Sequence, residues 1–219
     1  MANTSSLFGF KPIKYLNGAP WNGKIGVYYA SASDTAVIYK GDMVQLSTVA
    51  LNYESTGKYP TVKRAGVSSI MVGVAIGFST VPYISADPTN LFLSKRTAST
   101  AMYVFVVDDP MVIFESQESE VTLDIAVPLR ANDCFSNGKI TLGAGAAAGT
   151  LGNDTTGISY MGIDSSDVIA QTTTPATEAI KVLRLADRAN NALGAYAVWE
   201  VMINQHIFGS GSISVAKVS

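Results

Sequence analysis

The sequence predicts an all-β protein with the architecture of a β-sandwich, a jelly roll or a barrel, preceded by an extended N-terminal arm. Runs of strand length rich in β-branched and aromatic residues recur along the chain, the strongest at residues 70–78, 101–115 and 197–207. Gly, Ser, Thr and Asn are plentiful between them, as in proteins with many turns. No segment carries the apolar periodicity of a helix of definite length. The 219 residues suffice for one all-β domain with a sizeable core.

The chain divides into three predicted parts: the arm at residues 1–24, a β-rich domain at 25–208 and a Gly- and Ser-containing tail at 209–219. The arm holds large apolar side chains at irregular spacing. Glycines and prolines interrupt it, and we expect them to prevent a regular strand or helix. Two alternatives stay open: the arm packs on its own domain, or it lies along a partner. For the second alternative, the predicted partner-binding residues are Phe8, Phe10, Tyr15 and Trp21.

Short strands joined by turns are predicted throughout the β-rich domain. The expected strands cover residues 25–29, 36–39, 43–46, 70–78, 101–107, 111–115, 139–142, 159–163, 168–170, 179–185 and 197–207. The continuous apolar run at 70–78 predicts a strand buried on both faces. Asp108, Asp109 and Pro110 interrupt the run at 101–115, so we expect the two strands beside them to form a hairpin.

Three segments are less regular. The polar residues 47–65, with one glycine and one proline, predict a long surface loop. Residues 123–134 leave a short helix open, and Pro128 argues against a long one. Residues 179–185 alternate apolar and polar side chains and predict a strand, although their Ala, Glu and Leu content also suits a helix.

Composition and charge argue against several classes of function. Charged residues make up only 15% of the chain, the formal net charge is −2 and the pI is about 5.3. Because Lys and Arg form no cluster, we expect no direct binding to nucleic acid. No apolar stretch approaches the roughly 20 residues of a membrane span, and the N-terminus lacks the pattern of a signal peptide. We therefore expect a protein made in a cytoplasm, whose weakly charged surface is covered by partners.

The sequence offers little for catalysis. A Ser or Cys hydrolase needs a base beside its nucleophile, and the single histidine, His206, lies in a predicted strand. The single cysteine, Cys134, excludes an intrachain disulfide and is interpreted as a small buried apolar residue. One Cys and one His are too few for a structural zinc site. We expect no catalytic residue, no cofactor and no bound metal, and predict that the protein is not an enzyme.

Acidic side chains gather in two places. Asp108 and Asp109 are interpreted as turn residues, because Asp carboxylates bond the turning backbone. Glu115, Glu118 and Glu120 predict a solvated strand face or an electrostatic contact with a basic partner.

Three blocks of the chain, taken together, resemble a known protein family. They are YLNGAPWNG at residues 15–23, YVFVVDDP at 103–110 followed by FESQE at 114–118, and NNALGAYA at 190–197 followed by WEV at 199–201. This set is similar to the head decoration, or cement, proteins of tailed double-stranded DNA bacteriophages. The blocks span most of the chain, while residues 143–175 show no such likeness.

The resemblance implies a structural virion protein that decorates and stabilises the outer surface of the phage capsid by bridging subunits of the major capsid protein. It also implies a homo-oligomer, with a trimer favoured over a dimer, because decoration proteins often sit where three capsomers meet. The partners are then the major capsid protein and further copies of the chain. The family defines no catalytic residues that could be carried over.

Other hypotheses remain. The first alternative is a receptor- or carbohydrate-binding β module of a phage fibre or adhesin, in which exposed aromatic side chains form a platform for sugar rings. A major capsid protein is a further structural alternative, but such chains are usually longer and carry a long helix. An enzyme of unrecognised type is the last.

Overall fold

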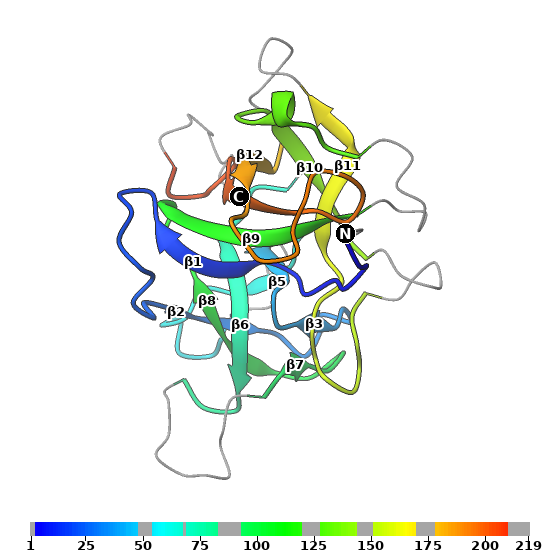
Figure 1. Ribbon diagram of the computed structural model, residues 1–219. Coiled ribbons are helices and arrows are strands. Elements are labelled where there is room, and N and C mark those ends of the chain that lie inside the picture. The colour runs from blue at the N-terminus through cyan, green and yellow to red at the C-terminus, as the bar shows by residue number, and fades with distance from the viewer. Residues whose placement is uncertain are drawn as a thin grey trace.

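The computed structural model describes residues 3–47, 54–67, 69–82, 93–119, 128–143, 151–169 and 178–209. In these ranges the chain is all-β, as predicted, and its strands form one six-stranded, one five-stranded and one two-stranded sheet (Figure 1). Ala131–Asp133 form a 3₁₀ turn, η2, in the segment whose sequence allows a short helix. No helix in the described ranges is long and apolar enough to span a membrane. Residues 210–219, most of the predicted tail, lie outside the described residues.

The first sheet closes into a five-stranded barrel. Its strands, in spatial order, are β1 (Lys11–Tyr15), β9 (Val112–Ser119), β11 (Gly162–Ile169), β10 (Asn137–Thr141), β12 (Ile180–Leu185) and β13 (Val198–Ile203). Because β9 also pairs with β13, the strands from β9 to β13 form a closed ring. The eight residues of β9 pair first with β1 and then, at their C-terminal end, with β11. Strand β1 is therefore an outer edge strand laid on a closed barrel.

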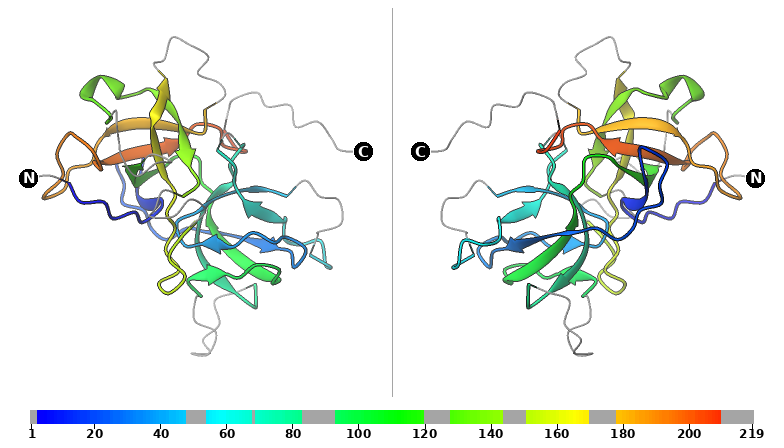
Figure 2. Two further views of the ribbon diagram at one scale, coloured as in Figure 1. Left: turned by 90° about the vertical axis from the view of Figure 1, so that its right-hand side faces the viewer. Right: turned by 90° about the vertical axis from the view of Figure 1, so that its left-hand side faces the viewer.

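The second sheet is antiparallel and nearly closes as well. It contains β2 (Gly26–Ala30), β8 (Met102–Val107), β6 (Gly73–Ser79), β4 (Met43–Leu46) and β5 (Val62–Arg64), in that order. A bridge between Tyr29 and Thr61 brings β5 back beside β2. The small sheet of β3 (Ile38–Tyr39) and β7 (Lys95–Arg96) completes the fold. The second sheet lies against the barrel, as both side views show (Figure 2).

Two apolar clusters stabilise this arrangement. One fills the barrel and its contact with the second sheet, and it includes Phe114, Trp199 and Val74. The other lies within the second sheet and includes Phe78 and Val104. Strand β6 contributes Val74 to the first cluster and Phe78 to the second. It is therefore buried on both faces, as its continuous apolar run predicted, and each such side chain contributes about 2 kcal/mol.

The predicted hairpin at residues 101–115 is wrong. Strand β8 belongs to the second sheet, where β2 and β6 occupy both of its edges, so no edge is left for β9. The residues between β8 and β9 instead cross from one sheet to the other. Their turn chemistry is as expected, because Asp109 Oδ1 accepts a hydrogen bond from the Met111 N–H at 2.9 Å. An apolar run on each side of a turn looks the same in a hairpin and in a crossover, which is why the sequence did not separate them.

Two other predictions are corrected, and a third is confirmed. Residues 47–65 are not all loop, since they contain β5; residues 48–53 lie outside the described residues. The strands expected at 159–163 and 168–170 are replaced by one continuous strand, β11. The strand predicted at residues 179–185 is confirmed as β12, Ile180–Leu185, and the rival helix is not formed.

Residues 3–24 lie on their own domain. The expectation that glycines and prolines keep this segment out of a regular strand is wrong, because β1 pairs with β9. Pro12 is tolerated because β1 is an edge strand, and the register shifts between Pro12 and Lys14. The chain then turns back, and the Trp21 N–H donates to the Ile13 carbonyl at 3.1 Å.

Candidate functional site

The N-terminal segment crosses the turn between β3 and β4 at two glycines. Gly9 and Gly41 have φ angles of +73° and +95°, and the Phe10 N–H donates to the Gly41 carbonyl at 2.9 Å. A Cβ atom on Gly9 would lie 2.6 Å from that carbonyl oxygen, so no larger residue fits without displacement. The crossing holds the segment in place and directs Phe10 into the core, where its side chain is 1% exposed.

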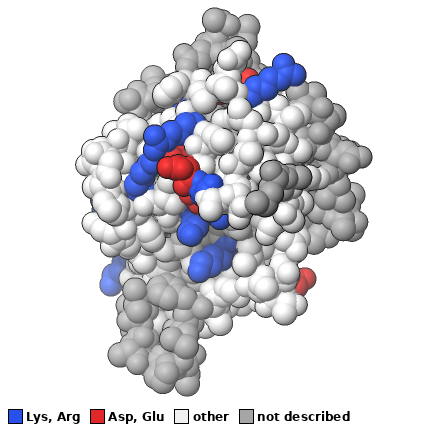
Figure 3. Space-filling view, viewed as in Figure 1, with Lys and Arg blue, Asp and Glu red and all other residues white. Residues whose placement is uncertain are grey.

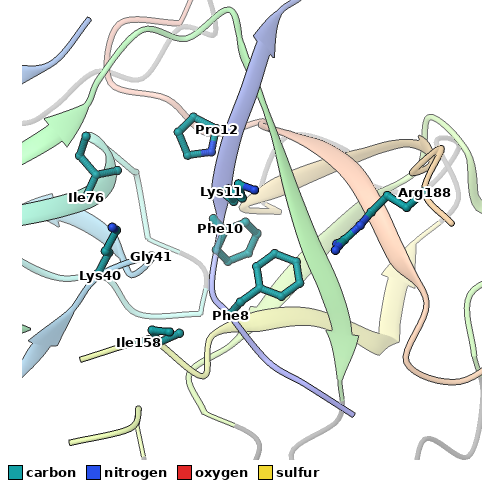
Figure 4. A pocket seen from close by; sticks show the side chains of 9 residues that line it. All are labelled: Phe8, Phe10, Lys11, Pro12, Lys40, Gly41, Ile76, Ile158 and Arg188. Atoms are coloured by element: carbon teal, nitrogen blue, oxygen red, sulfur yellow. The ribbon is translucent and has the colours of Figure 1, made fainter. Parts of the chain in front are cut away.

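A groove of about 450 Å³ opens beside this crossing (Figure 4). Its lining comes from the N-terminal segment, the β3–β4 turn, β6, the turn before β11 and the loop after β12. The lining residues are Phe8, Phe10, Lys11, Pro12, Lys40, Gly41, Ile76, Ile158 and Arg188. The volume suits a few side chains of a ligand or partner, since small-molecule sites span roughly 300–1,000 Å³.

The wall of the groove is mostly apolar. In Figure 4, Lys40 and Ile158 lie on one side of the Phe8 and Phe10 rings, and Arg188 reaches in from the other side. Ile158 is 36% exposed, and Phe8 is half-buried. The groove therefore presents apolar surface to solvent that a partner could cover.

The charged residues at the groove are all cations. Lys11 and Lys40 are exposed and form no ion pair with any described residue. The Arg188 guanidinium lies 5.7 Å from the centre of the Phe8 ring and 3.5 Å from Glu115. Its charge is thus partly satisfied within the chain, whereas the two lysines remain available.

A row of charged residues runs beside the groove across four neighbouring strands. Lys11, Glu115, Glu200 and Arg184 are successive partners in register on β1, β9, β13 and β12. Glu200 accepts hydrogen bonds from Lys14 Nζ and Arg184 Nε, both at 2.8 Å. Burial alone would raise the pKa of Glu200, but these two cations outweigh it and hold the pKa below its ordinary value. The Lys14–Glu200 ion pair fastens β1 to the barrel, and Figure 3 shows charges of both signs gathered on this face.

Two of the four predicted partner-binding residues meet at the groove. Phe8 and Phe10 both line it, but Phe10 is buried in the core of its own chain, so Phe8 is the ring available for contact. Tyr15 and Trp21 do not line it and instead pack, half-buried, against the barrel core. The Tyr15 hydroxyl donates to Asn22 Oδ1 at 2.8 Å.

A second aromatic feature lies on the outer side of the second sheet. The Tyr103 ring meets Tyr29 and Tyr59 edge to face, at centroid distances of 5.6 and 5.2 Å and interplanar angles of 62° and 78°. All three rings are half-buried. They pack on one another in steeply inclined planes, so they do not form one flat surface.

The expectation of a solvated acidic face fails for Glu118. Its side chain is fully buried inside the barrel, where Oε2 accepts a hydrogen bond from the Leu129 N–H at 3.0 Å and Oε1 one from the Ala197 N–H at 3.2 Å. Burial raises the pKa of Glu118 to about 7. Glu115 pairs within the chain, and Glu120 lies outside the described residues. The even-numbered side chains of β9 point into the barrel. The acidic composition of the segment gave no sign of this, so the sequence predicted a solvated face.

The two residues weighed for catalysis, His206 and Cys134, are buried and half-buried, respectively. His206 is 3% exposed, and its Nδ1 accepts a hydrogen bond from the Phe208 N–H at 3.1 Å. Cys134 is half-buried against the barrel core. Among the described residues, no group of three or more His, Cys, Asp or Glu side chains is arranged to hold a metal ion.

Several residues that line the groove could not be predicted from the sequence. Lys40, Ile158 and Arg188 are far apart in the chain and meet only in the fold. The sequence held one weaker sign of the crossing, namely the glycines Gly9 and Gly41. A glycine often marks a close approach of two backbones, as these two residues do.

Comparison with known proteins adds no assignment to this geometry. No protein-family model matches the sequence, and no curated protein and no solved structure is significantly similar to it.

Proposed function

We propose that this protein is a structural virion protein that decorates a phage capsid and stabilises it by bridging subunits of the major capsid protein. The observation that carries the proposal is the preformed groove, in which Phe8, Ile76 and Ile158 present apolar surface beside two lysines that form no ion pair within the described part of the chain. The three sequence blocks that resemble head decoration proteins give the partner its identity in this proposal.

The construction of the fold supports a binding role. The groove rests on a closed barrel and on a turn fixed by the Gly9–Gly41 crossing. The segments before β3 and after β7 are held as well, because the fully buried Arg96 donates hydrogen bonds to the carbonyls of Asp34 and Thr100 at 2.7 and 2.8 Å. A surface that is already ordered loses little conformational entropy on binding, so more of the contact energy appears as affinity.

The test is binding of the purified protein to capsids that lack it. Phe8→Ala removes the available ring of the groove, and we expect it to weaken capsid binding about tenfold or more, equivalent to about 1.4 kcal/mol. The matched control is Phe208→Ala, which removes a phenyl ring that is 60% exposed and outside the groove lining. Equal binding by both variants and the wild type would refute the groove as the contact, and failure of the wild type to bind would refute the capsid role.

The alternative is a carbohydrate-binding module, for which the Tyr29–Tyr59–Tyr103 cluster is the specific candidate. An aromatic ring face can stack on a sugar, but mutual edge-to-face packing occupies part of these rings. Glycan-array binding that is abolished by Tyr103→Ala and kept by Phe8→Ala would favour this function over capsid decoration.

A further inference from the structure

We infer that the groove binds an extended peptide segment that carries both apolar side chains and carboxylates. The inference rests on the proposed function, since it specifies the chemistry of the capsid-protein segment that the groove holds. It also makes a claim about the groove that can be tested without any capsid.

Charge complementarity identifies the occupant as acidic. The protein carries a formal net charge of −2, yet the charged residues that line the groove are three cations. Arg188 is engaged by Glu115 and by the face of Phe8. Lys11 and Lys40 are exposed, and each lacks a carboxylate within ion-pair distance among the described residues. Two ammonium groups on separate elements thus flank one apolar wall.

The apolar wall identifies the occupant as a peptide. A free inorganic anion would use the lysines but leave Phe8 and Ile158 exposed. A nucleic acid would need a longer track of cations to follow its phosphates. An extended peptide matches both features, because alternate side chains of an extended chain point in opposite directions and can place an apolar group in the wall and a carboxylate beside a lysine.

The lysines are also held in position. Lys11 is the first residue of β1, which pairs with β9, and its neighbour Phe10 is hydrogen-bonded to Gly41. Lys40 is fixed through its backbone, because its N–H donates to the Gly157 carbonyl at 2.9 Å and its carbonyl accepts from the Ser159 N–H at 2.9 Å. Both lysines therefore project from backbone that is ordered before binding.

The test is selection of a random peptide library on the immobilised full-length protein. We expect the enriched peptides to combine Asp or Glu with Leu, Ile, Val or Phe. Their affinity should fall about tenfold or more in the double variant Lys11→Glu, Lys40→Glu, and should weaken as salt screens the contact. The control is Lys58→Glu, Lys63→Glu, which makes the same change of charge away from the groove and should leave affinity unchanged.

The possible outcomes separate the inference about the groove from the proposed capsid function. Enriched peptides that lack acidic residues, peptides that bind the groove variant and the wild type equally, or no enrichment at all would overturn the inference. Acidic peptides that bind through Lys11 and Lys40, combined with no binding to capsids, would uphold the inference and reject the proposed function. Circular dichroism of both double variants confirms that each is folded before binding is compared.

Discussion

Asp42 and Arg64 form a buried ion pair that joins the turn after β3 to strand β5. Arg64 Nε lies 2.9 Å from Asp42 Oδ2, the Asp42 side chain is fully buried, and Asp42 Oδ2 also accepts the Tyr39 N–H at 2.8 Å. The same guanidinium donates to the carbonyl of Leu142, just beyond β10, and so links the second sheet to the barrel. The pair is therefore a structural joint between the two halves of the fold.

Replacing Arg64 by Ala should destabilise the protein strongly. The change leaves the Asp42 carboxylate buried without its counter-ion, which typically costs about 3–5 kcal/mol. Urea unfolding at neutral pH measures the loss. Arg184→Ala is the control, because that side chain is 61% exposed and Glu200 keeps Lys14 as a partner, so its loss should be about 1 kcal/mol or less. Similar losses in the two variants would contradict a special role for the buried pair.

Replacing Gly9 by Ala should disrupt the crossing that shapes the groove. The new methyl group would collide with the Gly41 carbonyl, in addition to the strain of a positive φ. Gly18→Ala isolates the second effect, since Gly18 has a φ of +88° and open space around it. We expect calorimetry to show a loss of about 1 kcal/mol for Gly18→Ala and of about 3 kcal/mol or more for Gly9→Ala. If the two losses are equal, backbone contact at the crossing does not matter.

The buried carboxyl of Glu118 should make the protein less stable as pH rises. Burial raises its pKa from 4.5 to about 7, so the folded state binds the proton more tightly than the unfolded state. The stabilising contribution is complete below a pH of about 4.5 and disappears as pH rises through about 7. The loss across this window should be about 3 kcal/mol.

Urea unfolding of the wild type and of Glu118→Gln between about pH 5 and pH 8 checks this slope. Wild type and variant are compared at each pH because His206 also titrates. Burial lowers the pKa of His206, so its contribution to stability increases as pH rises, whereas that of Glu118 decreases. The stability difference between wild type and variant should shrink as pH rises. A difference that is constant with pH would mean that Glu118 does not titrate in this window.

We also predict that the full chain forms a homo-oligomer, with a trimer favoured over a dimer. Adjoining apolar side chains such as Leu16 and Met111 are 48% and 50% exposed, and their backbones are linked by a 2.8 Å hydrogen bond. Sedimentation at micromolar concentration gives the mass directly. A monomer there would count against both the oligomer and the resemblance that suggested it.

The sequence revealed the strands better than their connections. Alternation and continuous apolar runs located β6, β8 and β13, because burial on one or both faces leaves a local pattern. The pattern does not say which strands pair, so the crossover after Val107 looked like a hairpin. Polar residues in buried places were also missed: Arg64 and Glu118 made their segments look solvated, although ion pairing and backbone hydrogen bonds allow both to be buried.

The candidate site was only half visible in the sequence. Aromatic residues among prolines marked the N-terminal segment, and Phe8 does reach the groove. Phe10 belongs to the core, and a single Phe gives no sign of which role it takes. The cations that determine the charge of the groove come from three separate parts of the chain, and only tertiary structure assembles them.

Strand β9 carries β1 and β11 one after the other along one edge while β13 lies along the other. This geometry has a mechanical consequence. Hydrogen bonds of an antiparallel pair run across the strand axis, so tension on the N-terminal segment along β1 loads all of its bonds to β9 together instead of opening them one by one. The force then spreads through β9 into the closed ring. A partner that pulls on the N-terminal segment along β1 would therefore release β1 as a unit or not at all.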